Sequence, residues 1–213
     1  KTVQYLPAAE PDAGATALAS LVEAMRGGKL STLVTLGGNP VYDAPADLDF
    51  AGALGAVATR IHLGLYAEET AASSTWHLPQ AHFLETWGDG LASDGSHLVS
   101  QPMIEPIWGG RSVIEMLTLL MGNAREGMAM VRESVGGSDV AWRKAVHDGF
   151  TAAGAAKAET VEARNLPSAA FDEASLASAP GNGALELNFA PCTKVWDGRF
   201  ANSGWLQELP DPI

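Results

Sequence analysis

The amino-acid sequence predicts an α/β fold, a Rossmann-like three-layer domain built on a mainly parallel sheet. Two short apolar stretches rich in β-forming residues, at 31–36 and 60–65, are separated by a helical pattern over about 47–57. A strand, a helix and a second strand in this order are typical of a parallel sheet with a crossover helix. A short third strand is expected at 75–78 and would extend the same sheet.

Three further helices are indicated by apolar spacing and by their end residues. Over residues 14–26, apolar side chains recur at the three- and four-residue spacing of a helix. Ser112 and Glu115 have the spacing of a capping box, and the apolar run that follows stops at Gly122, where a C-terminal glycine belongs. A last helix is predicted after Ser138, which can act as its N-cap.

The chain divides into three predicted regions. Residues 1–150 form the α/β domain, residues 151–183 are an Ala-rich linker with several Gly and Pro, and residues 184–213 are a tail with a predicted strand at 185–189. Within the domain, residues 82–111 are rich in Gly and Pro. A long loop with short strands is therefore expected there, and long ordered loops are often functional.

Composition and charge exclude several classes of protein. The 213 residues include 13 Lys and Arg against 25 Asp and Glu, and the net charge of −12 repels a nucleic acid backbone. A single cysteine, Cys192, permits neither an intramolecular disulfide nor an iron–sulfur cluster held by this chain alone. No apolar run approaches the roughly 20 residues of a membrane helix, so we expect a soluble piece without direct membrane insertion.

Four blocks of the sequence carry an ordered set of short motifs. A strand runs into an Asn-Pro loop, and Glu-Thr-Ala, Leu-Pro and a Glu with a following Gly come next. The blocks are residues 37–48, 68–89, 93–112 and 195–213, and the matching residues are Asn39, Pro40, Glu69, Thr70, Ala71, Leu78, Pro79, Glu85 and Gly88. In this order and spacing the chain resembles the molybdopterin oxidoreductases. Its Trp-His-Leu-Pro and Trp-Leu-Gln-Glu-Leu-Pro segments are similar to the iron–sulfur and molybdopterin-like subunit of alternative complex III, a quinol-oxidising membrane complex.

This resemblance implies a place for each region in a larger subunit. Residues 1–150 would be the third, Rossmann-like domain of that family, and residues 184–213 the truncated start of a C-terminal β domain that leads to a missing barrel. In relatives that carry molybdenum, the third domain holds the nucleotide end of a pterin guanine dinucleotide. The residues that match such a cofactor-binding role are Gly37, Gly38, Asn39, Pro40, Glu69, Thr70 and His77.

The resemblance also implies cofactors and partners. The parent family uses molybdopterin guanine dinucleotide and iron–sulfur clusters, but no cofactor is expected in this fragment, because the cysteine quartet and the metal-coordinating side chain would lie upstream. The leading interpretation is a scaffold and docking domain that contacts other domains of the parent chain and respiratory complex subunits. The parent is expected to be an exported oxidoreductase, membrane-associated on the periplasmic side, and the isolated fragment to be inactive.

Two other functions are consistent with the same residues. In the first, the chain binds one molybdopterin guanine dinucleotide in a molybdenum oxidoreductase. In the second, it is a free-standing nucleotide-binding or sensor module, which its abrupt ends disfavour. Residues 37–40 alone are also typical of a tight turn. His77, His82 and Glu85 do not have a familiar zinc spacing, so hydrogen bonding within a loop is favoured over a metal site.

Two more residue groups have the chemistry of an active site. Asp94, Ser96 and His97 are the residue types of a hydrolase triad, but they lie too close in sequence for triad geometry. Glu68 and Glu69 are a carboxylate pair that more often caps a short helix than performs acid–base chemistry.

Aromatic residues in the long loop are a candidate contact surface. Trp76, Trp87 and Trp108 lie within residues 68–111, together with Phe83. Large aromatic side chains dominate protein interfaces when they are left exposed. We therefore predict that this segment, with the turn at 37–40 beside it, is the surface through which the chain meets its parent.

The purified chain is predicted to be colourless and free of stoichiometric iron, molybdenum and zinc. One thiol and scattered histidines do not complete the coordination sphere of any of these metals. Elemental analysis by inductively coupled plasma mass spectrometry measures this directly, and one metal atom per chain would contradict the scaffold interpretation.

Overall fold

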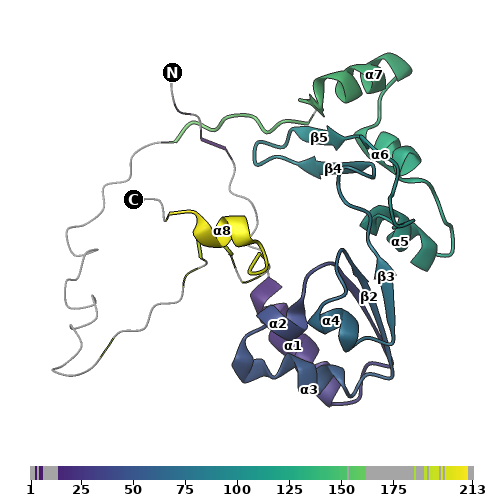
Figure 1. Cartoon of the computed structure of the whole chain (residues 1–213). Coiled ribbons are helices and arrows are strands. Elements are labelled where there is room, and N and C mark those ends of the chain that lie inside the picture. Colours follow the sequence, from purple (N-terminus) through teal and green to yellow (C-terminus); the bar gives the residue numbers. More distant parts are fainter. Residues whose placement is uncertain are drawn as a thin grey trace. The chain divides into compact units, whose positions relative to one another are not determined.

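The computed structural model describes residues 3, 5–6, 14–152, 154–161, 185, 190, 192–196, 198 and 200–210. The chain forms two units, Lys1–Glu159 and Thr160–Ile213. The first unit contains a three-stranded parallel sheet and a three-stranded antiparallel sheet (Figure 1). The second unit contains the short helix α8 (Gly204–Glu208).

The parallel sheet has strands β1 (Thr32–Leu36), β2 (Thr59–Gly64) and β3 (Trp76–Pro79), paired in the order of the sequence. Thr35, His62 and His77 are register partners across the three strands, and so are Val34, Ile61 and Trp76. The predicted strands at 31–36, 60–65 and 75–78 are all present to within one residue at each end. The parallel sheet and its helices confirm a Rossmann-like α/β fold.

The crossover from β1 to β2 is more broken than the sequence predicts. It consists of α2 (Pro40–Asp43), a 3-10 turn η1 (Ala46–Leu48) and α3 (Phe50–Leu54). The single helix expected over 47–57 is interrupted at Asp49, whose φ of 44° is left-handed and whose side chain caps α3 by accepting from the Gly52 N–H. A left-handed residue breaks the helical hydrogen-bond ladder. From β2 to β3 the chain passes through α4 (Glu69–Ala72).

Helices α1 (Gly14–Arg26) and α3 cover one face of the parallel sheet. Val22 and Met25 of α1 form a buried cluster with Phe50 and Leu54 of α3, and Leu33 of β1 packs against it. Two right-handed crossovers that step in the same direction place their helices on the same side of a sheet. Figure 1 shows α1 to α4 together on one side of β2 and β3.

The opposite side of this sheet, which we call the second sheet face, carries an apolar row. Side chains alternate along a strand, so Val34 lies on the face opposite Leu33, and its register partners Ile61 and Trp76 share that face. Leu63 of the neighbouring row is buried, whereas Val34 and Ile61 are half-buried and Trp76 is exposed. The second sheet face is therefore only partly covered.

Two of the three strands of the antiparallel sheet lie within the long loop segment. Strands β4 (Gly88–Leu91) and β5 (His97–Ser100) form a hairpin, and β6 (Phe150–Thr151) pairs with β5. Between β5 and β6 lie α5 (Val113–Leu120), α6 (Gly127–Val135) and α7 (Asp139–Asp148). The capping box of Ser112 and Glu115 is present at the start of α5, and Ser138 caps α7 by accepting from the Ala141 N–H, as predicted. Helix α6 was not predicted.

Most of the predicted linker and of the strand at 185–189 lies outside the described residues. The start of the predicted linker, up to Glu159, belongs to the first unit: the Ala156 N–H donates to the Asp94 carbonyl at 2.6 Å, and Glu159 forms an isolated bridge with Tyr5. Among the described residues, no helix has both the length and the apolar character of a membrane span.

Limited proteolysis is predicted to cut between residues 151 and 183 before it cuts the α/β domain. Ala-, Gly- and Pro-rich connections open locally at little free-energy cost. Because Ala156 and Glu159 are hydrogen-bonded within the first unit, the first cut is expected after Glu159. Mass spectrometry of the early fragments locates the cut, and initial cleavage within 31–65 would contradict this domain map.

Candidate functional site

The turn at residues 37–40 joins β1 to α2 at the carboxyl edge of the parallel sheet. Gly37 and Gly38 have φ of 72° and 73°, a left-handed conformation that favours glycine. The Gly37 N–H donates to the Leu63 carbonyl at 2.7 Å, which ties the turn to β2. Open α/β sheets place their binding crevice at this edge.

Asn39 connects the turn to the start of α4. Its side-chain oxygen accepts from the Thr70 N–H at 3.1 Å and from the Thr70 hydroxyl at 2.7 Å. Its amide nitrogen donates to the Glu69 carboxylate at 2.6 Å, and this bond lowers the pKa of Glu69. The Thr70 hydroxyl in turn accepts from the Val41 N–H at 3.1 Å. Thr70 is fully buried, so this network is part of the structure of the site.

Two histidines extend the network across the sheet. His62 of β2 is fully buried, and its Nε2 lies 3.1 Å from the Gly38 carbonyl oxygen. Its Nδ1 lies 3.2 Å from Nδ1 of His77 on β3. A carbonyl oxygen only accepts, so Nε2 of His62 carries a proton and donates to Gly38. In neutral His62, Nδ1 then accepts from His77.

Burial keeps His62 uncharged. Desolvation lowers the pKa of His62, the hydrogen bond to Gly38 opposes this effect, and the nearby His77 lowers the pKa further. The neutral imidazole therefore acts as a fixed hydrogen-bond link between the turn and β3. His62 was not among the predicted site residues, although a histidine inside the apolar strand was a visible signal that a buried partner is needed.

The structure thus brings all the predicted cofactor-site residues into one cluster. Gly37, Gly38 and Asn39 lie in the turn, Pro40 begins α2, Glu69 and Thr70 begin α4, and His77 reaches the turn through His62. Within the described part of the chain, the backbone N–H groups of Gly38 and Asn39 have no partner. A Cβ added at Gly38 would meet no atom within 4 Å, so the space outside the turn is open.

The aromatic residues of the long loop divide into two groups. Trp76, Phe83 and Trp108 are 63%, 67% and 83% exposed. Trp87, in contrast, packs on Trp142 of α7, with ring centroids 5.7 Å apart. Trp87 is half-buried, and its ring contributes to packing between the hairpin segment and α7, so it offers less surface to a partner than the other three aromatic residues do.

The other candidate groups are structural in the described residues. His97 pairs with Asp89 at 2.9 Å, while Asp94 accepts from the Ser96 N–H, so the three residues make no triad. No group of three or more His, Cys, Asp or Glu that could hold a metal is present among the residues that the structure describes. Glu68 is the N-cap residue of α4 and Glu69 lies in its first turn, but the Glu68 side chain makes no capping hydrogen bond.

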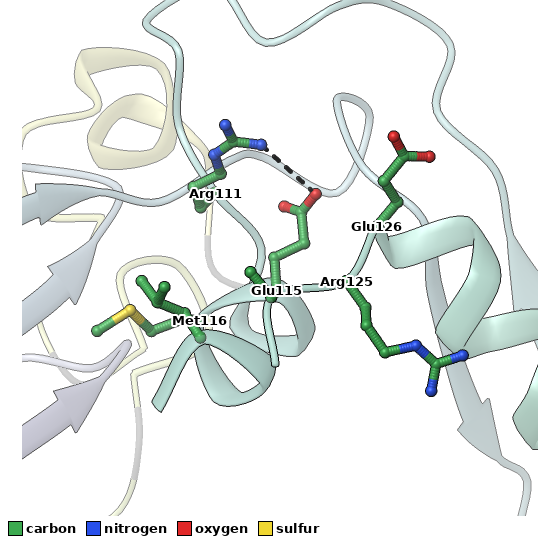
Figure 2. A pocket seen from close by; sticks show the side chains of 7 residues that line it. Arg111, Glu115, Met116, Arg125 and Glu126 are labelled. Atoms are coloured by element: carbon green, nitrogen blue, oxygen red, sulfur yellow. Dashed lines mark ion pairs between the residues drawn. The ribbon is translucent and has the colours of Figure 1, made fainter. Parts of the chain in front are cut away.

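A shallow pocket of about 320 Å³ lies beside α5, at the start of α6 (Figure 2). Its lining residues are Arg111, Glu115, Met116, Leu119, Ala124, Arg125 and Glu126. Glu115 is already engaged, since it accepts from Ser112 in the capping box and pairs with Arg111 at 3.8 Å. Arg125 points away from Glu115 in Figure 2 and pairs with Glu133. These charges stabilise the two helices.

Comparison with known proteins gives only a distant structural likeness. No family model matches the sequence, and no curated protein matches it. Among solved structures, acetylene hydratase from Pelobacter acetylenicus is similar, with a TM-score of 0.41 and 21% sequence identity. The match covers 48% of this chain and 15% of the hydratase chain, so this chain spans less than a sixth of that protein.

Thr70→Val is predicted to destabilise the chain by about 1–3 kcal/mol. The valine has nearly the same shape but removes the hydroxyl, so the half-buried Val41 N–H loses its acceptor and the Asn39 side-chain oxygen keeps only the Thr70 N–H. Urea unfolding measures the change in free energy. Thr32→Val on the exposed start of β1 is the matched control and should change stability by no more than about 0.5 kcal/mol. Equal effects of the two changes would show that the network contributes nothing.

The stability of the chain is predicted to fall as the pH drops below about 6.5, the ordinary pKa of histidine. The folded pKa of His62 is lowered, so the unfolded chain binds a proton at a higher pH than the folded chain does, and acid favours unfolding. The loss approaches about 1.4 kcal/mol per pH unit for one proton. His62→Gln should flatten the dependence between pH 7.5 and 5.5, while His147→Gln on the surface of α7 should retain it. Stability of the unmodified chain that does not change between pH 7.5 and 5.5 would contradict this prediction.

Proposed function

We propose that this chain is a scaffold and docking domain of a molybdopterin-oxidoreductase-like respiratory subunit in a quinol-oxidising complex. The domain holds neighbouring domains and subunits in place while electrons pass through clusters elsewhere in the parent. The observation that carries the docking role is the partly covered second sheet face.

The apolar row on the second sheet face is expected to be buried by another protein surface. Parallel sheets occur almost only with both faces covered, and here the crossover helices lie on one side. Val34 and Ile61 are half-buried and Trp76 is exposed, so their burial against another protein surface would be favourable by roughly 25 cal/mol per Å² of apolar area. The exposed Phe83 and Trp108 add to the apolar surface of the same segment.

The family part of the proposal is supported by the four ordered sequence blocks. A Rossmann-like sheet is the fold expected of the third domain in that family. The narrower assignment to the alternative complex III branch, its electron transfer role and its periplasmic location depend on the sequence motifs alone. The full reading frame separates the possibilities: iron–sulfur motifs only after the barrel favour the scaffold, whereas an early cysteine quartet with a metal ligand favours a molybdenum enzyme.

A second candidate function is binding of the nucleotide end of molybdopterin guanine dinucleotide at the 37–40 turn. The backbone N–H groups of Gly38 and Asn39 are unpaired among the described residues and are available to bind a phosphate, as such groups do at strand ends. Glu69, ionised through its bond to Asn39, suits a ribose hydroxyl. Titration with GDP, followed by NMR shifts of the Gly38 and Asn39 amides, tests it. Shifts that persist in Glu69→Gln and Gly38→Ala variants would argue against a specific site.

Trp76→Ser in the whole parent protein is predicted to weaken assembly by tenfold or more. A buried tryptophan at an interface commonly contributes above about 2 kcal/mol, and tenfold corresponds to about 1.4 kcal/mol. Val140→Ser on the exposed surface of α7 is the control, since it also removes an exposed apolar side chain. Size-exclusion chromatography of the parent measures assembled material. Equal yields from the two variants would refute the docking role of the second sheet face.

A further inference from the structure

The loop at residues 103–108 is a separate apolar projection from the long loop segment. Met103, Ile104, Ile107 and Trp108 are 73%, 49%, 67% and 83% exposed, so four large apolar side chains within six residues face solvent. Solitary exposed apolar residues are common, but a contiguous group of this kind marks an interaction site. Glu105 lies in the middle of the group.

The backbone of this loop is held in one shape. The Met103 and Ile104 N–H groups both donate to the Leu84 carbonyl, at 2.7 and 3.1 Å. Glu85 accepts from the Ile107 N–H at 3.0 Å with one carboxylate oxygen and from the His82 N–H at 2.9 Å with the other. These two bonds lower the pKa of Glu85, so the carboxylate stays charged at neutral pH.

The carboxyl end of the loop is fixed as well. The Arg111 N–H donates to the Pro79 carbonyl at 3.1 Å, and the Ala81 N–H donates to the Arg111 carbonyl at 2.9 Å. Gly110 lies so close to this segment that an added Cβ would be 2.8 Å from the Ala81 nitrogen, which only glycine avoids. A loop that is ordered before binding loses little entropy on binding.

We propose that residues 103–108 are a pre-formed insertion loop for an apolar pocket on another protein domain, edged by a lysine or arginine that pairs with Glu105. This inference rests on the docking function proposed above. Glu85 is a positioning residue, because it holds the Ile107 backbone and so the direction of Ile107 and Trp108. Among the described residues, Glu105 has no hydrogen-bond or ion-pair partner, and it is exposed.

The charge of Glu105 indicates which kind of partner binds the loop. Burial of a carboxylate among four apolar side chains is costly without a cation beside it. A second copy of this chain carries the same net charge of −12 and would bring acidic surfaces together. The hydrocarbon of a bilayer supplies no cation, and an anionic leaflet repels this chain. A basic-edged pocket on another protein domain satisfies both the apolar side chains and the carboxylate.

Hydroxyl-radical footprinting of the whole parent against the isolated chain tests the proposal. Met103 and Trp108 are expected to label at least tenfold more slowly in the parent. Trp76 reports on the second sheet face separately. Protection of Trp76 without protection of Met103 would overturn the insertion loop and leave the docking function in place. Labelling of both residues at the rate of the isolated chain would overturn both.

Charge reversal tests the cation. In the parent, Glu105→Lys should restore fast labelling of Met103, whereas Glu126→Lys, the same change at another exposed glutamate whose side chain has no described partner, should not. Equal labelling in the two variants would overturn the paired cation.

The positioning role of Glu85 has its own test. Glu85→Gln should raise hydrogen exchange at the Ile107 amide by about tenfold, and an unchanged rate would rule out the positioning role of Glu85. Binding of the isolated chain to phosphatidylcholine vesicles, lost in Trp108→Ala, would assign the loop to a membrane instead and contradict the proposal.

Discussion

The parallel register of β1, β2 and β3 is the constraint on which the rest of the first unit depends. Three strands that follow one another in the same direction require crossovers, and right-handed crossovers in one direction place their helices on one side. With this strand order, α1 and α3 pack against Leu33 on one face of the sheet, and Val34, Ile61 and Trp76 lie on the other face. The parallel register also brings the ends of β1 and β2 to one edge, where the 37–40 turn forms.

At that edge, the same residues are both packed in the interior and hydrogen-bonded to the turn. His62 is buried because it lies inside the sheet, and burial keeps it neutral so that it can link Gly38 to His77. Asn39 is committed to Thr70 and Glu69, so its side chain fixes the turn and does not remain free for a ligand. What stays available is backbone, the N–H groups of Gly38 and Asn39. This division fits either a rigid scaffold or a site that recognises phosphate through its main chain.

The exposed apolar surface has a different physical origin from the turn. Trp76 is exposed because of the strand order, while Trp108 is exposed because its loop is held outward by Glu85 and Leu84. An apolar side chain on a mobile loop would fold back onto the protein, but hydrogen bonds at both ends of this loop oppose that. Trp87 differs from these residues, since its ring packs on Trp142 within the unit and is half-buried.

The sequence by itself determined the elements whose signals are local. The capping box of Ser112 and Glu115, the Ser138 cap and the strand boundaries depend on residues a few positions apart, so pattern and propensity were sufficient. The residues of the turn cluster were also found by motif. Only the tertiary structure decided the role of His62, the break at Asp49, the helix α6 and the packing of Trp87 on Trp142. Each depends on groups distant in sequence or on a backbone conformation set by packing, and no local pattern encodes these.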